Sequence, residues 1–333
     1  MADLYPFLLI PEFRERVWGT RDLRPIYTRV VGKEPIGEVW LTGDECKVAN
    51  GPLSGRSLGD LCRQFGDQLV GTATEPKDRF PLLIKFLFPR EKLSVQVHPD
   101  DEGAQKLGLP NGKTECWYVA RAVAGAQVGL GVKPGVTREE FKRAIEETRA
   151  EQLLNWIDVQ TGDMLYVDAG TVHAIGPNSI LIETQQNSDT TYRLYDYGRP
   201  RELHVEQGLQ AMREVTHAGK VPAQTIDGHQ LLVASSRFVV ERFTATEPMT
   251  LTADPGPSSV HILVSADGAA VIESEGTQPV VFNRGEAIVI PATVRQFTVR
   301  PQWSVEFLRM RVPAEKLAPP ATTMPSTGVT TNE

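Results

Sequence analysis

The sequence is poor in cysteine and has no excess of positive charge. Its three cysteines, Cys46, Cys62 and Cys116, are odd in number and show no CxxC spacing, so we predict reduced, mainly structural thiols. Lysine and arginine number 35 against 42 acidic residues, a net charge of −7. This balance argues against a general nucleic-acid-binding protein. It leaves room for an anionic small substrate, because a pocket needs only a few local cations.

Long apolar runs are also missing. The longest apolar strand, PLLIKFLF (81–88), is interrupted by Lys85 and is far too short to span a bilayer. The first residues, MADLYPFLLIPEFRER, lack the basic region and the long apolar region of a secretory signal peptide. We therefore expect a soluble, cytoplasmic protein with no membrane partner.

Short alternating apolar runs, separated by glycine, proline and aspartate, are what the sequence does contain. The chain has 333 residues, 41% of them hydrophobic, with 24 prolines and 28 glycines, which suits a turn-rich protein of two domains. Runs such as GEVWL, TECWYVA and DMLYVDAG are typical of an antiparallel sandwich or barrel. The predicted fold class is therefore mainly β.

Two stretches break the β pattern. Residues 137–157 carry apolar residues at helical spacing, and Thr137 with Glu140 forms a capping box, so we predict a helical insertion there. The stretch ELHVEQGLQAMRE (202–214) predicts a shorter helix. Strand-like runs resume after a polar segment. The prediction is a first domain over 1–215, a second over 216–315, and a Pro/Thr-rich disordered tail over 316–333.

An internal repeat relates the two halves. GDMLYVDAGTVHAIG (162–176) aligns with GEAIVIPATVRQFTV (285–299), which places His173 opposite Gln296. Since only the first half has a histidine at this position, we expect the chemistry in the first half. The histidines at 204, 217, 229 and 261 have no partner in spacing and are interpreted as structural or exposed.

Four side chains of the first half form a candidate metal site. In LSVQVH, Gln96 and His98 point to the same face of a strand; Glu115 lies on the next apparent strand, and His173 closes the repeat unit. A lone histidine is more often structural, but this combination can hold a divalent metal such as zinc and leave one position open.

Here the residues meet a known family. VWG, PLLIKFLF, LSVQVHPDD, GKTECWYV, AGTVHAIG and NSDTTYRLYDYGR together resemble the type I mannose-6-phosphate isomerases of the short bacterial form, in the cupin superfamily. The resemblance implies a bicupin, two double-stranded β-helix (jelly-roll) barrels with a few short helices. It implies one Zn²⁺ per chain, held by Gln96, His98, Glu115 and His173, and a degenerate second domain without metal ligands. We expect a monomer or a weak homo-oligomer.

Charged residues near these motifs are candidates for the substrate site. Lys85 interrupts an apolar strand and needs a partner if buried, and a substrate phosphate could be that partner; the alternative is a snorkelling lysine on an edge strand. Lys113 precedes Glu115 by two residues, so on a strand both side chains would point the same way, and the resemblance implies a lysine near the reacting carbons. The alternative is a loop lysine beside Gly112. Asp189 and Arg193 share one face by alternation. The resemblance implies that both line the pocket, and the alternative is a surface ion pair.

Two further points bear on the predicted pocket. Trp18 packs against the sugar or the phosphate end, or else in the core. After Arg193 the chain reads Leu-Tyr-Asp-Tyr, where longer relatives continue with Ala-Gly, so the lining of the pocket is expected to differ there.

The activity implied is interconversion of mannose 6-phosphate and fructose 6-phosphate through an enediol, with the metal polarising the carbonyl. Lys113, a zinc-bound water and Asp189 are the candidate bases, and Arg193 supplies electrostatic stabilisation. Three alternatives stay open: a glucose 6-phosphate isomerase, an iron-dependent cupin dioxygenase, and a non-catalytic sugar-binding cupin.

Overall fold

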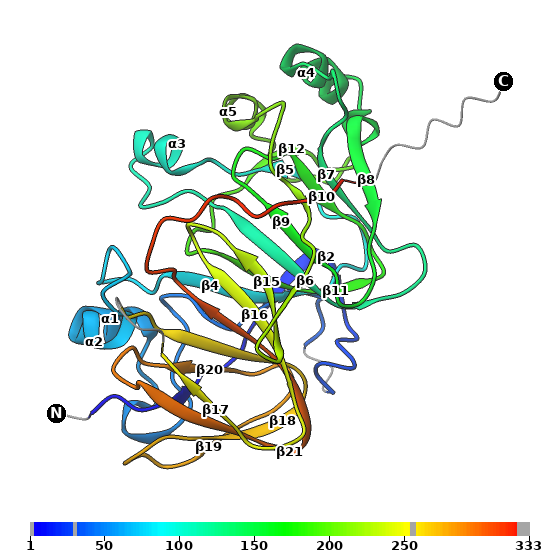
Figure 1. Ribbon diagram of the computed structural model, residues 1–333. Helices are drawn as coiled ribbons and strands as arrows, with labels where there is room; N and C mark the ends of the chain where they lie inside the picture. Colours follow the sequence, from blue (N-terminus) through cyan, green and yellow to red (C-terminus); the bar gives the residue numbers. More distant parts are fainter. Residues whose placement is uncertain (1–2, 29–31, 254–257, 325–333) are drawn as a thin grey trace.

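The computed structural model of the protein describes residues 3–28, 32–253 and 258–324. These residues fold into three antiparallel sheets. Figure 1 shows them as two stacked lobes. The first lobe contains a seven-stranded sheet, in the order β13 (Gly219–Lys220), β9 (Met164–Val167), β6 (Glu115–Ala122), β11 (Ser179–Gln186), β4 (Leu82–Leu87), β3 (Ile36–Trp40) and β2 (Glu12–Thr20). Facing it is a five-stranded sheet, in the order β12 (Tyr192–Tyr195), β5 (Val95–Val97), β10 (His173–Ile175), β7 (Gln127–Val132) and β8 (Leu154–Asp158).

The second lobe is one nine-stranded sheet that curls over itself. Its main path runs β1 (Phe7–Leu8), β20 (Ala287–Ile290), β18 (His261–Glu273), β21 (Gln296–Arg311), β16 (Val239–Ala245), β15 (His229–Ala234) and β14 (Gln224–Ile226). Two strands pair off this path, β17 (Met249–Thr252) with β21 and β19 (Val280–Phe282) with β18. The mainly β, two-barrel fold class is confirmed.

The larger sheet of the first lobe matches the main path of the second in strand order. The path from β13 to β2 in the first lobe has the same order as the path from β1 to β14 in the second. In the second lobe β18 and β21 are long strands that each continue through both layers. The first lobe has two separate strands in place of each: β6 and β7 in place of β18, and β10 and β11 in place of β21. The repeat predicted from the sequence is therefore a structural repeat: His173 pairs with Gln96 across strands, and its counterpart Gln296 pairs with Thr252.

Alternation along the strands separates the cores of the two lobes. Inward residues of the first lobe, such as Trp117 and Leu181, fill the space between its two sheets. Outward residues of the same strands, such as Ile84 and Phe86, pack in a shared core with Ile262 and the rest of the second lobe. The two lobes are thus joined by a continuous apolar layer, which encloses all three cysteines as buried, unpaired thiols.

Helices lie at the edges of this frame: α1 (Leu58–Phe65), α2 (Asp67–Val70), α3 (Asp101–Lys106), α4 (Arg138–Glu146) and α5 (Val205–Ala211), with 3-10 turns at Gly51–Leu53 and Ala150–Leu153. The apolar faces of α4 and α5 pack on the outer side of the five-stranded sheet (Figure 1). Thr137 caps α4 as predicted, by accepting a hydrogen bond from the Glu140 amide.

The predicted helix over 137–157 is too long. α4 ends at Glu146, Thr148 has a left-handed φ of 57°, and Leu154–Asp158 is strand β8. Pairing of β8 with β7, which buries Leu154 and Ile157, outweighs the local helical pattern. The shorter helix, α5, lies where it was predicted.

Two short strands, β1 and β13, pair with strands on the other side of the predicted domain boundary. β1, near the N-terminus, pairs with β20 of the second lobe, whereas β13, beyond residue 215, pairs with β9 of the first. Thr323, in the tail predicted to be disordered, forms two backbone hydrogen bonds with Lys220, and residues 325–333 lie outside the described residues. The domain limits stay predictions. Within the described ranges, no helix is long and apolar enough to cross a membrane.

Both lobes contain a buried ion pair at matching strand positions. Lys85 on β4 faces Glu183 on β11, with 2.9 Å between Lys85 Nζ and Glu183 Oε2. In the second lobe Glu241 on β16 faces Arg309 on β21, which donates two hydrogen bonds of 2.8 and 2.9 Å. The charges are exchanged between the two lobes.

His261, buried beside the Glu241–Arg309 pair, is expected to make the protein sensitive to acid. Burial, reinforced by Arg309 and Arg311 and opposed by Glu241, lowers the pKa of His261 to about 3. In the unfolded chain its pKa is about 6.5, so the unfolded state binds a proton first and stability is lost as the pH falls from 6.5 towards 3. Between pH 6.5 and 4, His261→Asn should lose about 3 kcal/mol less unfolding free energy than the unsubstituted protein. Urea unfolding at several pH values measures this, and equal acid slopes would contradict it.

Candidate metal centre and active-site cleft

The candidate metal ligands come from both sheets of the first lobe. Gln96 on β5 and His173 on β10 are direct cross-strand neighbours, and His98 follows β5 immediately. Glu115 begins β6 in the facing sheet, with its side chain turned inward by the alternation that also buries Trp117. Two hydrophobic sheets therefore bring ligand-type side chains together at their shared edge.

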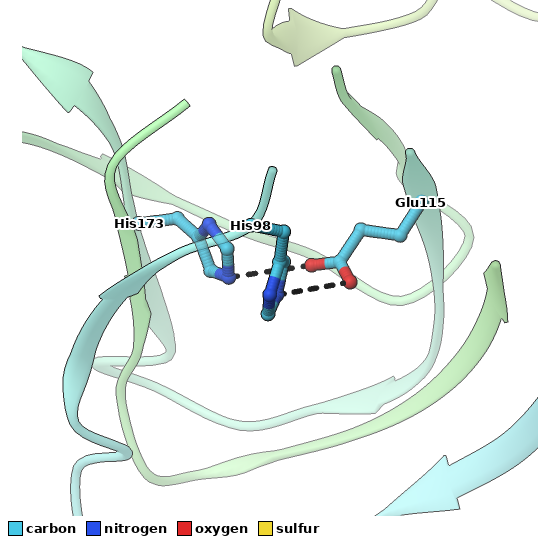
Figure 2. A group of neighbouring side chains, drawn as sticks. All are labelled: His98, Glu115 and His173. Atoms are coloured by element: carbon cyan, nitrogen blue, oxygen red, sulfur yellow. Dashed lines mark ion pairs between the residues drawn. The ribbon is translucent and has the colours of Figure 1, made fainter. Parts of the chain in front are cut away.

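His98, Glu115 and His173 converge closely, as Figure 2 shows. Glu115 Oε2 lies 3.5 Å from His98 Nε2, and Glu115 Oε1 lies 3.3 Å from His173 Nε2. All three side chains are buried, and their ligand atoms lie within 4.8 Å of one another. Among the described residues they are the one such group of three or more His, Cys, Asp or Glu.

Hydrogen bonds orient both imidazoles. His98 Nδ1 lies 2.8 Å from the carbonyl oxygen of Thr190, and His173 Nδ1 lies 2.9 Å from that of Thr171. A carbonyl only accepts, so each Nδ1 carries the proton and each Nε2 keeps its lone pair, which faces the Lys113 ammonium in His98 and the Gln96 amide in His173. Metal-binding histidines commonly donate this way to a backbone carbonyl through the ring nitrogen that does not bind the metal.

Protonation favours the same role for the histidines. Burial lowers the pKa of His173 to about 4, and burial and the Lys113 charge lower the pKa of His98 well below its usual range. Both imidazoles are therefore neutral at pH 7. Burial raises the pKa of Glu115, and a divalent cation between the three groups would favour its charged form.

The carboxylate of Glu115 has unused acceptor capacity. Both of its oxygens are buried and accept no hydrogen bond, and Oε2 has the Lys113 ammonium 3.1 Å away as an ion-pair partner, although polar groups this deep are nearly always fully satisfied. Two neutral imidazoles and an unsatisfied carboxylate match the nitrogen and oxygen donors that zinc and related divalent metals take. The residues fit a metal ion.

Gln96 differs from the other predicted ligands in its orientation. Its Oε1 accepts a hydrogen bond of 3.1 Å from Ser94, and its Nε2 lies 3.2 Å from His173 Nε2. As a metal ligand it would have to turn its amide over and present the oxygen. Gln96 is thus beside the metal group, and its role as a ligand stays a prediction.

Lys113 joins the metal group directly. Its Nζ lies 3.0 Å from His98 Nε2 and 3.1 Å from Glu115 Oε2, and the side chain is buried. Lys113 does lie in a loop, just before β6, but its buried side chain contacts the metal group instead of solvent. Because it also lines the neighbouring cleft, its ammonium lies between the metal ligands and the space for a substrate.

A cleft of about 440 Å³ opens next to the metal group. The predicted site residues that line it include Trp18, Lys85, Gln96, Asp189 and Arg193. Thr191, Arg16 and Arg201, which were not predicted as site residues, line it as well. Trp18 is part of the apolar core and also lines the cleft, and its contact with the sugar or the phosphate stays a prediction. Asp189 is exposed and lies outside the His98–Glu115–His173 group.

Lys85 lies on the cleft wall but does not lack a partner. β4 is an inner strand between β11 and β3, so the edge-strand interpretation is wrong. Glu183 pairs with Lys85, which removes the argument that burial alone requires a phosphate there. Burial by itself would lower the pKa of Lys85, but Glu183 and Glu38 reverse the effect and raise it. The lysine is therefore charged at pH 7.

Glu183 is a site residue that sequence reasoning missed. It is buried, accepts a 3.1 Å hydrogen bond from the Trp117 indole, and lines the cleft. Its burial would raise its pKa, yet Lys85 and Lys113 outweigh this and lower it. The signal was present in the sequence, because SILIET places one acid in an apolar run just as PLLIKFLF places one lysine.

Arg193 and Arg201 form a cationic wall of the cleft. Arg193 donates to the Glu202 carbonyl at 2.6 Å, while its buried Nε donates to no acceptor. Arg201 makes two hydrogen bonds, of 2.7 and 2.6 Å, to the buried carboxylate of Asp196. Asp196 belongs to the Leu-Tyr-Asp-Tyr segment that follows Arg193, and it also pairs with Arg199.

Comparisons with known proteins agree on one family. The family model described as phosphomannose isomerase type I, catalytic domain, matches residues 7–122. Mannose-6-phosphate isomerase ManA of Bacillus subtilis is 34% identical over 315 residues, covering 88% of this chain and 95% of the relative. Mannose-6-phosphate isomerase of Streptococcus mutans is 32% identical over 305 residues, covering 88% and 94%. The solved mannose 6-phosphate isomerase from Bacillus subtilis matches with a TM-score of 0.82 and 30% identity, over 92% of this chain and 99% of that chain.

Proposed function

The chain belongs to the type I mannose-6-phosphate isomerase family, and we propose that it interconverts mannose 6-phosphate and fructose 6-phosphate in the cleft of the first lobe. One observation supports this most: a buried group of two neutral imidazoles and a carboxylate opens onto a cleft whose lining includes the cationic side chains of Arg16, Lys85, Lys113, Arg193 and Arg201. A phosphorylated sugar needs both features, an electrophile for its carbonyl and cations for its phosphate.

The metal proposed is one zinc ion per chain, with His98, Glu115 and His173 as ligands and Gln96 as a fourth. Bound there, it would supply Lewis acidity, polarising the sugar carbonyl and stabilising negative charge on its oxygen. The cytoplasmic location and the monomeric or weakly oligomeric state stay predictions.

The chain's own residues perform the rest of the proposed mechanism. Isomerisation removes a proton from the carbon beside the carbonyl and returns it to the neighbouring carbon through an enediol. Lys113, buried between the ligands and the cleft, is placed to move a proton or to stabilise the enediolate. Lys85 and the arginines hold the phosphate, so that binding energy away from the reacting carbons orients the sugar.

Removing metal tests the proposal. Chelation should abolish conversion of mannose 6-phosphate to fructose 6-phosphate, and zinc should restore it, because the carbonyl then regains its electrophile. The rate is measured by coupling fructose 6-phosphate to a dehydrogenase, with glucose 6-phosphate as the comparison substrate. A folded, zinc-loaded sample that converts neither sugar would overturn the proposal, and oxygen consumption with iron would then favour a dioxygenase.

A further inference from the structure

A single carboxylate, that of Asp101, anchors the segment that carries Lys113. Asp101 Oδ1 accepts hydrogen bonds from the Gly112 amide, at 2.8 Å, and from Gln186 Nε2, at 3.0 Å. Gln186 Oε1 in turn accepts from the Thr114 amide at 2.9 Å. The residues on both sides of Lys113 are therefore fixed to Asp101, one directly and one through Gln186.

The segment has little other freedom. The Lys113 amide donates to the Pro99 carbonyl at 3.0 Å. A Cβ on Gly112 would lie 2.4 Å from the Asp100 backbone, so only glycine allows the two strands of chain to approach this closely. Such packing gives Lys113 one position, with its Nζ on His98 and Glu115.

The second lobe reaches this anchor. Arg237, in the turn between β15 and β16, forms an ion pair with Asp101 Oδ2. This oxygen is the one that Gly112 and Gln186 do not use. Arg237 therefore crosses from the second lobe to the residue that positions the Lys113 segment, and it contacts neither the metal ligands nor the substrate cleft.

We propose that Arg237 is a positioning residue for catalysis: through Asp101 it holds residues 111–114, and so Lys113, in the reactive arrangement. The second lobe, whose described residues contain no comparable group of metal ligands, thereby contributes to the reaction. The side chains of the pair are 42% and 27% exposed, and ion pairs this exposed contribute little to stability. Arg237 thus acts on geometry more than on folding.

The test uses zinc-loaded full-length protein and three variants. Arg237→Gln removes the ion pair; Asp101→Asn removes its charge but keeps an oxygen for Gly112; Arg237→Lys keeps the charge. Arg79→Gln is the matched control, since Arg79 lines the same cleft between the lobes as Arg237 but pairs with Asp44. Hydrogen exchange of the Gly112 and Thr114 amides reports the anchor, and kcat and KM report the chemistry.

We expect Arg237→Gln to lower kcat about tenfold with little change in KM or Tm, because a displaced catalytic group costs rate more than binding. Exchange at Gly112 and Thr114 should quicken. Arg237→Lys should recover most of kcat. The double variant Arg237→Gln/Asp101→Asn should have a kcat no lower than that of the slower single variant, as expected for one shared contact.

Unchanged exchange at Gly112 and Thr114 in Arg237→Gln would overturn the anchor, and faster exchange with an unchanged kcat would overturn its role in catalysis. An equal loss of kcat in Arg79→Gln would also overturn the proposal. The kinetic part rests on the proposed function. The exchange measurement does not, so a protein without isomerase activity would still show whether Arg237 holds the segment.

Discussion

Replacing His173 with alanine is expected to lower kcat/KM for mannose 6-phosphate at least about a thousandfold and to release most of the zinc. The substitution removes an Nε2 that faces Glu115 and leaves the carboxylate with one imidazole partner instead of two. Zinc content by elemental analysis and the coupled isomerase rate measure the two effects on the same sample.

The repeat offers a matched control for this variant. Gln296 occupies the position of His173 in the second lobe, where it pairs with Thr252 as His173 pairs with Gln96. Gln296→Ala should keep full activity and zinc content, because the metal site lies in the first lobe. If His173→Ala keeps its zinc and its rate, the proposed metal centre is wrong.

Lys85→Met should have the second largest effect, on stability and on substrate binding together. It leaves Glu183 buried without its cation, a change that typically costs about 3–5 kcal/mol of unfolding free energy. It also removes a cation from the cleft, and the loss of one charged hydrogen bond to phosphate should raise KM roughly 10- to 100-fold. Urea unfolding and steady-state kinetics measure the two effects.

A double variant separates the two roles of Lys85. In Lys85→Met/Glu183→Gln the unpaired charge is gone while the Trp117 indole keeps an acceptor, so stability should partly return and KM should stay high. The comparison is Arg309→Met/Glu241→Gln, which alters the corresponding pair of the second lobe and should leave KM unchanged. A normal KM in the Lys85→Met/Glu183→Gln protein would show that Lys85 is structural only.

Patterns within single strands predicted much of this site. Alternation in LSVQVH placed Gln96 and His98 on one face, and the repeat singled out His173; the structure brings His98 and His173 together with Glu115. The same reasoning placed Asp189 and Arg193 along one face, and both line the cleft although only Arg193 lies within β12. A strand of period two fixes side-chain direction locally, so the placement of Gln96 on β5 could be read from the sequence.

Contacts that depend on strand register could not be predicted in this way. Glu183 faces Lys85 only because β11 pairs with β4 in one particular register, which neither strand's pattern specifies. Arg237 and Asp101 come together from different lobes. The strand β8 formed within a helical pattern because an unpaired edge of β7 was available to it, and this depends on tertiary pairing rather than on local propensity.

The exchanged ion pairs of the two lobes differ in how easily they can change partners. In the first lobe a lysine ammonium, which has three equivalent donors on a flexible stem, contacts one oxygen of Glu183 beside an open cleft. In the second, the planar fork of Arg309 contacts both oxygens of Glu241 and lies over the Phe243 ring, 5.2 Å from its centroid. Lys85 also lies over a ring, that of Trp40, but it can share its charge with an arriving phosphate by rotating about side-chain bonds, whereas Arg309 would have to give up both hydrogen bonds of its planar fork. Restoring metal ligands to the second barrel would therefore not suffice to make it an isomerase, because its cation is committed to an internal carboxylate.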